Sequence, residues 1–158
     1  MSRTGRVVIA STRAAAGRYE DRCGPVIVEW LRRAGLEVGD AVVVPDGPAV
    51  AEALRSAVRE RTDVVITSGG TGISPTDGTP EATRAVIDYE IPGLADAIRR
   101  SGLPAVPTSM LSRGVCGVAG RSLVINLPGS TGGVRDGLAV LDAVLDHALD
   151  QLAGGDHP

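Results

Sequence analysis

The sequence contains no lysine, and all sixteen of its basic residues are arginine. The absence of lysine excludes a phosphate-binding loop with an essential lysine, a Schiff-base enzyme and a pyridoxal enzyme. Histidine is also scarce, because only His147 and His157 are present and both lie near the C-terminus. A histidine-based catalytic triad and a three-histidine zinc site therefore have no source of ligands. Any chemistry must therefore use Asp, Ser, Thr, Arg and backbone amides, with or without a bound metal.

Aromatic residues and long apolar runs are scarce too. Two Tyr, one Trp, no Phe and a net charge of -3 leave few stacking surfaces and no broad basic field, so we expect no nucleic-acid partner. The N-terminal apolar stretch is too short for a signal peptide or a membrane span, which predicts a cytoplasmic protein without a membrane contact. Cys23 and Cys116 are far apart and have no metal-ligand spacing, so we expect two reduced thiols.

The first half of the chain alternates short apolar strands with helices of about a dozen residues. With 158 residues and 43% hydrophobic content, we expect one domain over residues 1–158, with a core from about 5 to 152 and a flexible tail at 153–158. The alternation predicts an α/β fold of three layers, with a mostly parallel sheet flanked by helices. The expected strands are 6–11, 42–44 and 63–68, and the expected helices are 21–34 and 49–61.

The second half has a less regular pattern. Two short apolar runs at 115–118 and 122–126 are consistent with a hairpin or with adjoining strands. A leucine stripe predicts one long final helix over 133–152. The remaining expected segments are helices at 80–89 and 92–100 and an irregular stretch at 104–110.

The stretch from Thr67 to Thr83, TSGGTGISPTDGTPEAT, joins an apolar strand to a glycine-rich loop that contains one acid. Backbone N–H groups in Gly69, Gly70, Thr71 and Gly72 are little covered by side chains, which favours the binding of a phosphate or another oxyanion. The acid, Asp77, is followed by a helix start at Thr79-Pro80-Glu81, where we expect the threonine hydroxyl to cap the helix.

Polar residues follow each expected strand, and ligands of open α/β sheets bind at the carboxyl ends of the strands. Asp46 and Asp77 lie on two such loops, and Mg²⁺ is usually held by one or two carboxylates together with substrate phosphates. Each acid alone is equally consistent with an ordinary turn or a helix cap, and a short glycine run is often only a turn. Because all three features occur at strand ends, together they predict a catalytic site with a metal held by both acids.

Two further loops supply groups that bind phosphates. Arg113 can hold a phosphate through two N–H groups and the adjacent Ser112 through one hydroxyl, although a solvated surface arginine is as common. Asn126, the single asparagine, stands at the end of the last strand beside a Pro-Gly turn.

Two long motifs in this chain resemble those of the molybdenum-cofactor biosynthesis proteins of the Mog/MoaB type. GGTGISPTDGTPEAT resembles the glycine-loop signature of that family, and LSRGVCGVAGRSLVINLPGS resembles its second signature. DRCGP near the first helix and the pair Pro45-Asp46 are also similar. The resemblance covers roughly residues 5 to 152 in matching order.

The resemblance implies a homotrimer that carries out Mg²⁺-dependent adenylyl transfer from ATP to the terminal phosphate of molybdopterin, with release of pyrophosphate. It also implies hand-over of the product to the enzyme that inserts molybdenum. Asp46 and Asp77 match the essential acids of the family. The matching positions for substrate and nucleotide binding are Ser11, Ser68, Gly69, Gly70, Thr71, Gly72, Ser112, Arg113, Asn126, Pro128, Gly129 and Ser130.

Three positions differ from the family pattern. Thr76 stands where an arginine is frequent, Gly47 where an acid is frequent, and Thr12 where an aspartate is frequent. The first two changes remove charge near the expected nucleotide site, so a molybdopterin-binding carrier without catalysis is the alternative function. A Rossmann-type reductase is disfavoured, because the loop STRAAAG after the first strand lacks the glycine fingerprint.

Overall fold

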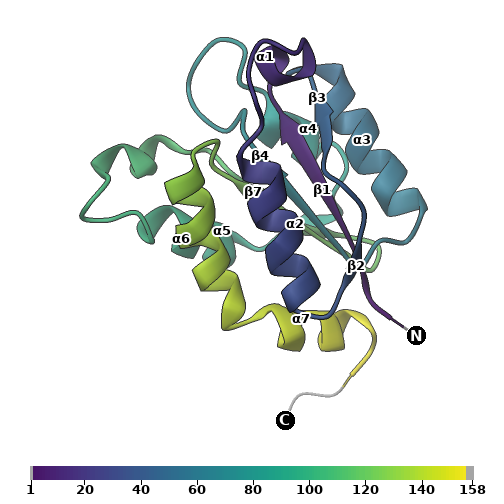
Figure 1. Ribbon diagram of the computed structural model, residues 1–158. Coiled ribbons are helices and arrows are strands. Elements are labelled where there is room, and N and C mark those ends of the chain that lie inside the picture. Colours follow the sequence, from purple (N-terminus) through teal and green to yellow (C-terminus); the bar gives the residue numbers. More distant parts are fainter. Residues whose placement is uncertain (1, 156–158) are drawn as a thin grey trace.

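The computed structural model describes residues 2–155, which form a seven-stranded mixed sheet with helices on both faces (Figure 1). Three parallel strands make its centre, and a short antiparallel pair extends it on one side. On the other side, two short strands pair one after the other along the same edge of one neighbouring strand. The strands are β1 (Thr4–Ala10), β2 (Glu37–Val38), β3 (Val42–Val44), β4 (Val64–Ser68), β5 (Tyr89–Glu90), β6 (Cys116–Ala119) and β7 (Ser122–Leu127).

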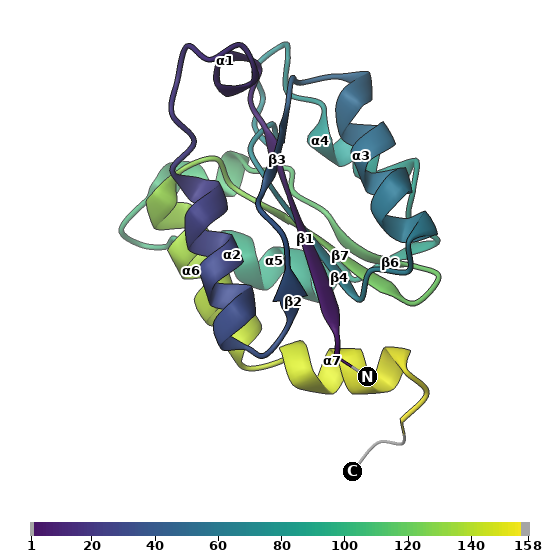
Figure 2. The ribbon, with the colours of Figure 1, turned by 45° about the vertical axis from the view of Figure 1, so that its right-hand side comes forward.

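Alternating side chains of the central strands point to two separate cores. In β1, Val7 and Ile9 pack into one core, and Val8 and Ala10 pack into the other, as the two-residue period of a strand requires. The first core is closed by α2 (Cys23–Arg33), α5 (Pro92–Arg100), α6 (Thr131–Asp142) and α7 (Leu145–Leu152). The second is closed by α3 (Pro48–Arg59) and α4 (Thr79–Arg84), on the opposite face (Figure 2). The predicted three-layer α/β fold is confirmed.

The predicted hairpin is also confirmed, because β6 and β7 pair in antiparallel fashion. The prediction of a helix over 80–89 is wrong at its end: α4 stops at Arg84, and Tyr89 belongs to β5. The backbone groups of β6 explain the difference, since the N–H of Asp88 donates to the carbonyl of Val118 at 2.7 Å and that of Ile91 to Cys116 at 2.7 Å. Pairing with this strand therefore prevails over local helical spacing.

The single final helix that we expected is two helices, broken at Ala143 and Val144. Helix α7 turns beneath the sheet, at the end opposite to α1 (Thr12–Ala15) (Figure 2). Leu141, Leu145 and Leu149 are buried on both sides of the break, so the leucine stripe stays on the core although the axis changes direction.

Two smaller segments are more regular than the sequence predicts. The expected irregular stretch contains a 3-10 helix, η1 (Pro107–Leu111). In the expected flexible tail, the N–H groups of Ala153, Gly154 and Gly155 bond back to the last turn of α7, and residues 156–158 lie outside the described part of the chain. Within residues 2–155, no helix is both long and apolar enough to cross a membrane.

Candidate functional site

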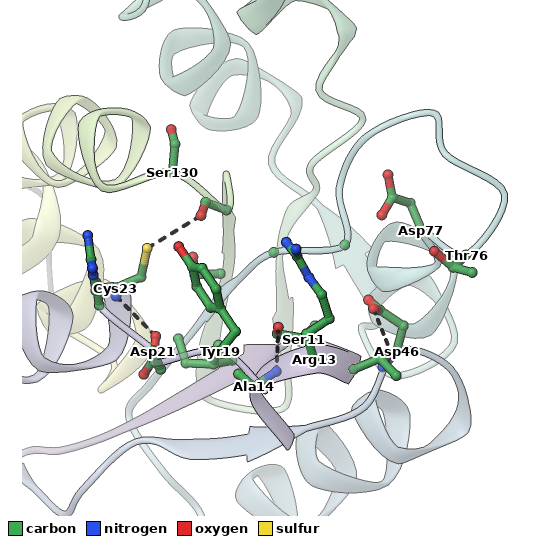
Figure 3. Close-up of a pocket in the computed structure, with 18 of the residues that line it drawn as sticks. Ser11, Arg13, Ala14, Tyr19, Asp21, Cys23, Asp46, Thr76, Asp77 and Ser130 are labelled. Atoms are coloured by element: carbon green, nitrogen blue, oxygen red, sulfur yellow. Dashed lines mark hydrogen bonds between the residues drawn. The ribbon is translucent and has the colours of Figure 1, made fainter. Parts of the chain in front are cut away.

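The loops that follow β1, β3, β4 and β7 meet at the carboxyl end of the sheet, near α1 (Figure 1). They enclose a cavity of about 660 Å³, which we call the first cavity (Figure 3). Its walls include the predicted residues Ser11, Asp46, Ser68, Gly69, Gly70, Asp77, Gly129 and Ser130. Residues from four separate loops are thus brought together at the place that the strand order predicts.

The glycine loop is pressed against the end of β1. Gly69 and Gly70 have φ angles of 95° and 68°, and a Cβ atom on Gly69 would lie 2.4 Å from the carbonyl oxygen of Ala10. The N–H of Gly69 donates to Leu127, whereas those of Gly70, Thr71 and Gly72 have no acceptor within residues 2–155. These three consecutive donors fit an oxyanion, as the sequence predicts.

The threonine at the start of α4 differs from its prediction. Gly78 occupies the capping position of this helix, and no side chain caps it. The hydroxyl of Thr79 instead donates to the carbonyl of Gly69 at 2.9 Å, and the N–H of Thr79 donates to Gly70 at 3.0 Å. Thr79 therefore braces the glycine loop, because its side chain points back toward β4.

The two predicted acids, Asp46 and Asp77, both line the first cavity (Figure 3). The hydroxyl of Thr12 donates to Asp46 Oδ2 at 3.1 Å and accepts the N–H of Asp46 at the same distance. Asp77 Oδ2 accepts the N–H of Ser74 at 3.1 Å. Residues 2–155 hold no cluster of three or more His, Cys, Asp or Glu side chains suited to a metal. Two carboxylates on one cavity are a donor set that could hold Mg²⁺ together with substrate phosphates and water.

The side chain of Arg113 is hydrogen-bonded to the loop that carries Asp77. Its Nε donates to the carbonyl of Gly72 at 2.9 Å, and its Nη2 donates to the carbonyl of Asp77 at 3.2 Å. Nη1 and Nη2 also contact both carboxylate oxygens of Glu81, at 2.7 and 3.2 Å. This ion pair lowers the pKa of Glu81. The guanidinium thus binds protein groups, where the sequence predicted a phosphate. It lines neither the first cavity nor a second cavity between the glycine loop and α6.

Asn126 has an internal position. Its side chain accepts the N–H of Val115 at 3.0 Å and donates to the hydroxyls of Thr67 and Thr83 at 3.0 and 2.9 Å. With 3% exposure and both amide hydrogens engaged, the side chain has no donor left for a nucleotide. Its contacts connect β7 to β4 and α4, and so fix the start of the turn that leads to Pro128.

The predicted serines lie on the cavities and also organise the chain. The hydroxyl oxygens of Ser11 and Ser130 accept N–H groups in the first turns of α1 and α6. Ser68 donates to the carbonyl of Pro128 at 2.7 Å, and Ser112 accepts the N–H of Gly114. Ser11 and Ser130 keep their own hydroxyl hydrogens for a ligand, because both act here only as acceptors.

Sequence reasoning missed Arg13 and Tyr19, which also line the first cavity (Figure 3). The guanidinium carbon of Arg13 lies 5.2 Å from the centre of the Tyr19 ring, the geometry of a cation–π contact. The guanidinium of Arg13 has no hydrogen-bond or ion-pair partner within residues 2–155. The available signal was the position of Arg13 two residues after Ser11, just beyond the end of the first strand.

The N-terminus of α2 also faces this cavity but is already neutralised. Asp21 accepts the N–H groups of Cys23 and Gly24 at 3.0 and 3.1 Å, so its carboxylate caps the helix. Burial raises the pKa of the Cys23 thiol, and burial raises that of Cys116 to about 12. Both residues are free cysteines, as predicted, and both are buried.

A second cavity of about 580 Å³ adjoins the first, and the two share Gly70, Asp77, Gly129 and Ser130. The second cavity lies between the glycine loop, the segment around η1 and the first turns of α6. Among the predicted residues it also takes in Thr71, Gly72, Ser112 and Pro128. Asp77 therefore stands where the two cavities meet.

A family model described as a probable molybdopterin binding domain matches residues 6–147 of this chain. A molybdopterin adenylyltransferase of Helicobacter pylori (strain J99) is 36% identical over 94% of this chain and 86% of its own length. A solved structure of the molybdopterin biosynthesis Mog protein from Mycobacterium ulcerans superposes with a TM-score of 0.93, at 62% identity, and covers 98% of this chain and 99% of that one.

A longer relative carries a similar segment. A molybdenum cofactor biosynthesis bifunctional protein of Synechococcus elongatus is 38% identical over 96% of this chain, which corresponds to 48% of that protein. The chain thus spans about half the length of the bifunctional relatives that it matches.

Proposed function

This chain belongs to the Mog/MoaB family of molybdopterin-binding proteins, and we propose that it transfers an adenylyl group from ATP to the terminal phosphate of molybdopterin. The observation that carries the proposal is the meeting of two cavities at Asp77, beside an oxyanion loop with three unpaired N–H groups. A transfer between two substrates needs two adjoining sites with the reacting groups at their junction.

The charges of the first cavity favour it for the nucleotide. Arg13 and Arg22 line it, and the guanidinium of Arg13, which has no ion-pair partner among residues 2–155, can neutralise a triphosphate. The family often has an arginine at the position of Thr76, and Thr76 and Arg13 line the same cavity. Arg13 can therefore replace the positive charge that is absent at position 76. The cationic group is then supplied by α1, the short helix after β1, in place of the glycine loop.

The reaction needs positioning more than a strong base. The terminal phosphate oxygen of molybdopterin attacks the α-phosphorus of ATP, the bond to the α,β-bridging oxygen breaks, and pyrophosphate leaves with the electron pair. No redox change and no net proton transfer are required, which suits a chain without catalytic lysine or histidine. The N–H groups of Gly70, Thr71 and Gly72 hold phosphate oxygens as charge develops on them.

Asp46 and Asp77 would hold Mg²⁺, since they are the two acids of the first cavity that do not cap a helix. When bound, the ion supplies charge neutralisation at the phosphates. Thr12 orients the carboxylate of Asp46 for this purpose through its hydroxyl.

The decisive experiment mixes the purified protein with ATP, Mg²⁺ and molybdopterin and measures pyrophosphate. We expect release that depends on all three components. The alternative, a carrier that binds molybdopterin without catalysis, is motivated by Gly47 and Thr76, which remove charge from this end of the sheet. Molybdopterin binding without pyrophosphate release would establish the carrier and eliminate the enzyme.

Three expectations from the sequence stay proposals. We expect a homotrimer, and light scattering that shows a monomer would contradict it. We expect the product to pass to the molybdenum-inserting enzyme, a partner suggested by relatives in which a similar segment is part of a bifunctional protein. A cytoplasmic location likewise stays a prediction.

A further inference from the structure

The two cavities differ sharply in charge. The first is lined by arginines and acids, whereas the ionisable side chains of the second are Asp77 and Asp136 alone. No cationic side chain within the described residues lines the second cavity. A cavity with acids and without cations repels a phosphate and suits a neutral ligand that carries hydrogen-bond donors.

Asp136 is available to such a ligand. It lies in the second turn of α6, is partly buried, and has no hydrogen-bond or ion-pair partner within residues 2–155. The other acid of this cavity, Asp77, sits at the junction with the first cavity and belongs to the metal site proposed above. Asp136 is therefore the acceptor that the second cavity offers away from the reacting phosphates.

The remaining walls suit the faces of a flat ring. Val106 and Leu111 line the cavity although they are 49% and 51% exposed, so their apolar surfaces are open to a ligand. Pro128 adds a third apolar surface, and Gly132 and Gly133 leave space for close approach beside α6. The hydroxyl side chains of Thr108, Ser109 and Ser112 also line this cavity. Apolar surfaces combined with a small number of polar groups are the usual composition of a site for a heterocycle.

We propose that the second cavity binds the 2-amino-4-oxo pteridine ring and that the carboxylate of Asp136 accepts hydrogen bonds from the aminopyrimidine edge of the ring. The ring N3–H and the exocyclic 2-amino group are adjacent donors on one edge, and a carboxylate accepts both through its two oxygens. The proposal rests on the proposed function, because molybdopterin is the pterin substrate there. It assigns specificity to a residue outside both sequence signatures.

The test compares two rings in the wild-type protein and in Asp136→Asn, by fluorescence titration. The probes are 6-hydroxymethylpterin, which has the 2-amino group, and 6-hydroxymethyllumazine, which has a 2-oxo group in its place. We expect the wild type to prefer the pterin by about 10- to 100-fold, because the carboxylate would face an unpaired oxygen in the lumazine complex. In Asp136→Asn the preference should vanish or invert, since an amide offers one acceptor and one donor.

Asp146→Asn is the matched control, with the same loss of charge on the exposed face of α7, and it should keep the wild-type preference. An unchanged preference in Asp136→Asn, or binding of neither ring at millimolar concentration by the wild type, would overturn the proposal. Thermal melting checks that each variant is folded.

Pyrophosphate release by the same preparations separates the two proposals. Release by the wild type together with an unaltered preference in Asp136→Asn refutes the role of Asp136 and leaves adenylyl transfer intact. A preference that depends on Asp136, without pyrophosphate release, refutes adenylyl transfer and leaves pterin recognition intact.

Discussion

The loops that carry Asp46 and Asp77 face the same cavity but are held in place differently. The Asp46 turn is short, and Thr12 on the neighbouring loop fixes it with two hydrogen bonds through a single hydroxyl. The loop that leads to Asp77 is long, and its carbonyls are bound by Arg113, which is distant in sequence. Both partners are distant in sequence, since Thr12 is 34 residues from Asp46 and Arg113 is 36 residues from Asp77. The difference is that one hydroxyl fixes the short turn, whereas the longer loop is held at two carbonyls by a guanidinium with several donors.

The largest effect that we expect comes from Asp77→Asn, which removes a charge at the junction of the two cavities and changes little volume. Turnover should fall by about 10³-fold, since a metal ligand stabilises the transition state by several kcal/mol. Pterin binding should be largely preserved. Pyrophosphate release and fluorescence titration measure the two quantities, and Asp146→Asn is the control. Undiminished turnover at saturating Mg²⁺ would remove Asp77 from the mechanism.

Gly70→Ala tests the contact between the two loops. A Cβ atom here would lie 2.3 Å from Thr79 Oγ1 and 3.0 Å from Asp46 Oδ1, and the φ of 68° disfavours a side chain. We expect the free energy of unfolding to fall by about 2 kcal/mol and turnover by about 100-fold, because Asp46 and Thr79 must move. Chemical denaturation and the pyrophosphate assay measure these effects.

Gly78→Ala is the matched control for Gly70→Ala. It lies at the other end of the same loop, has a φ of -142°, and a Cβ atom there would meet nothing within 4 Å. Equal losses in the two variants would show that the loop tolerates no side chain anywhere, and that the contact with Asp46 is not the cause.

Arg113→Ala removes the remote support of the Asp77 loop alone. We expect about a tenfold loss of kcat and faster hydrogen exchange of the amides at 73–78, because the carbonyls of Gly72 and Asp77 lose their donors. If Arg113 instead holds a substrate phosphate, KM for ATP or molybdopterin should rise while exchange stays unchanged. That outcome would restore the role predicted from the sequence.

Glu81→Gln weakens the same support through its ion pair, and its effect should be smaller because the pair is exposed. Arg113 lowers the pKa of Glu81, so the pair stabilises the fold above the ordinary glutamate range and this contribution is lost as pH falls through the lowered pKa. The acid sensitivity of exchange at 73–78 should therefore disappear in Glu81→Gln.

The smallest effect should come from Thr12→Val, which removes one hydroxyl beside Asp46. We expect the Mg²⁺ concentration at half-maximal pyrophosphate release to rise about threefold, because one hydrogen bond near the surface contributes little net free energy. Thr12→Ser keeps the hydroxyl and should match the wild type in a Mg²⁺ titration of pyrophosphate release. A loss as large as that of Arg113→Ala would show that both loops depend equally on their partners.

The alternation of apolar strands and helices was sufficient to predict the layers and the strands β1, β3 and β4, whereas the two-residue strand β2 was missed. Because a parallel sheet brings its loops together at one end, the same pattern predicted which loops surround the first cavity. Local spacing predicted a helix at Tyr89, which instead pairs with the neighbouring strand β6. It also predicted one final helix, which is broken at Ala143 so that the leucines on both sides stay in the core. The resemblance correctly indicated the family and the segments that surround the first cavity.

The sequence by itself determined which groups are available for chemistry: no lysine, a glycine loop, and two acids at strand ends. Only the tertiary structure decided how they are used. It turned Asn126 inward and bound Arg113 to backbone carbonyls. It left the Arg13 guanidinium and the Asp136 carboxylate without a hydrogen-bond or ion-pair partner among residues 2–155, beside two adjoining cavities. Hydrogen-bond partners and burial depend on residues far apart in the chain, so residue type and spacing alone cannot assign a polar side chain to the ligand or to the fold.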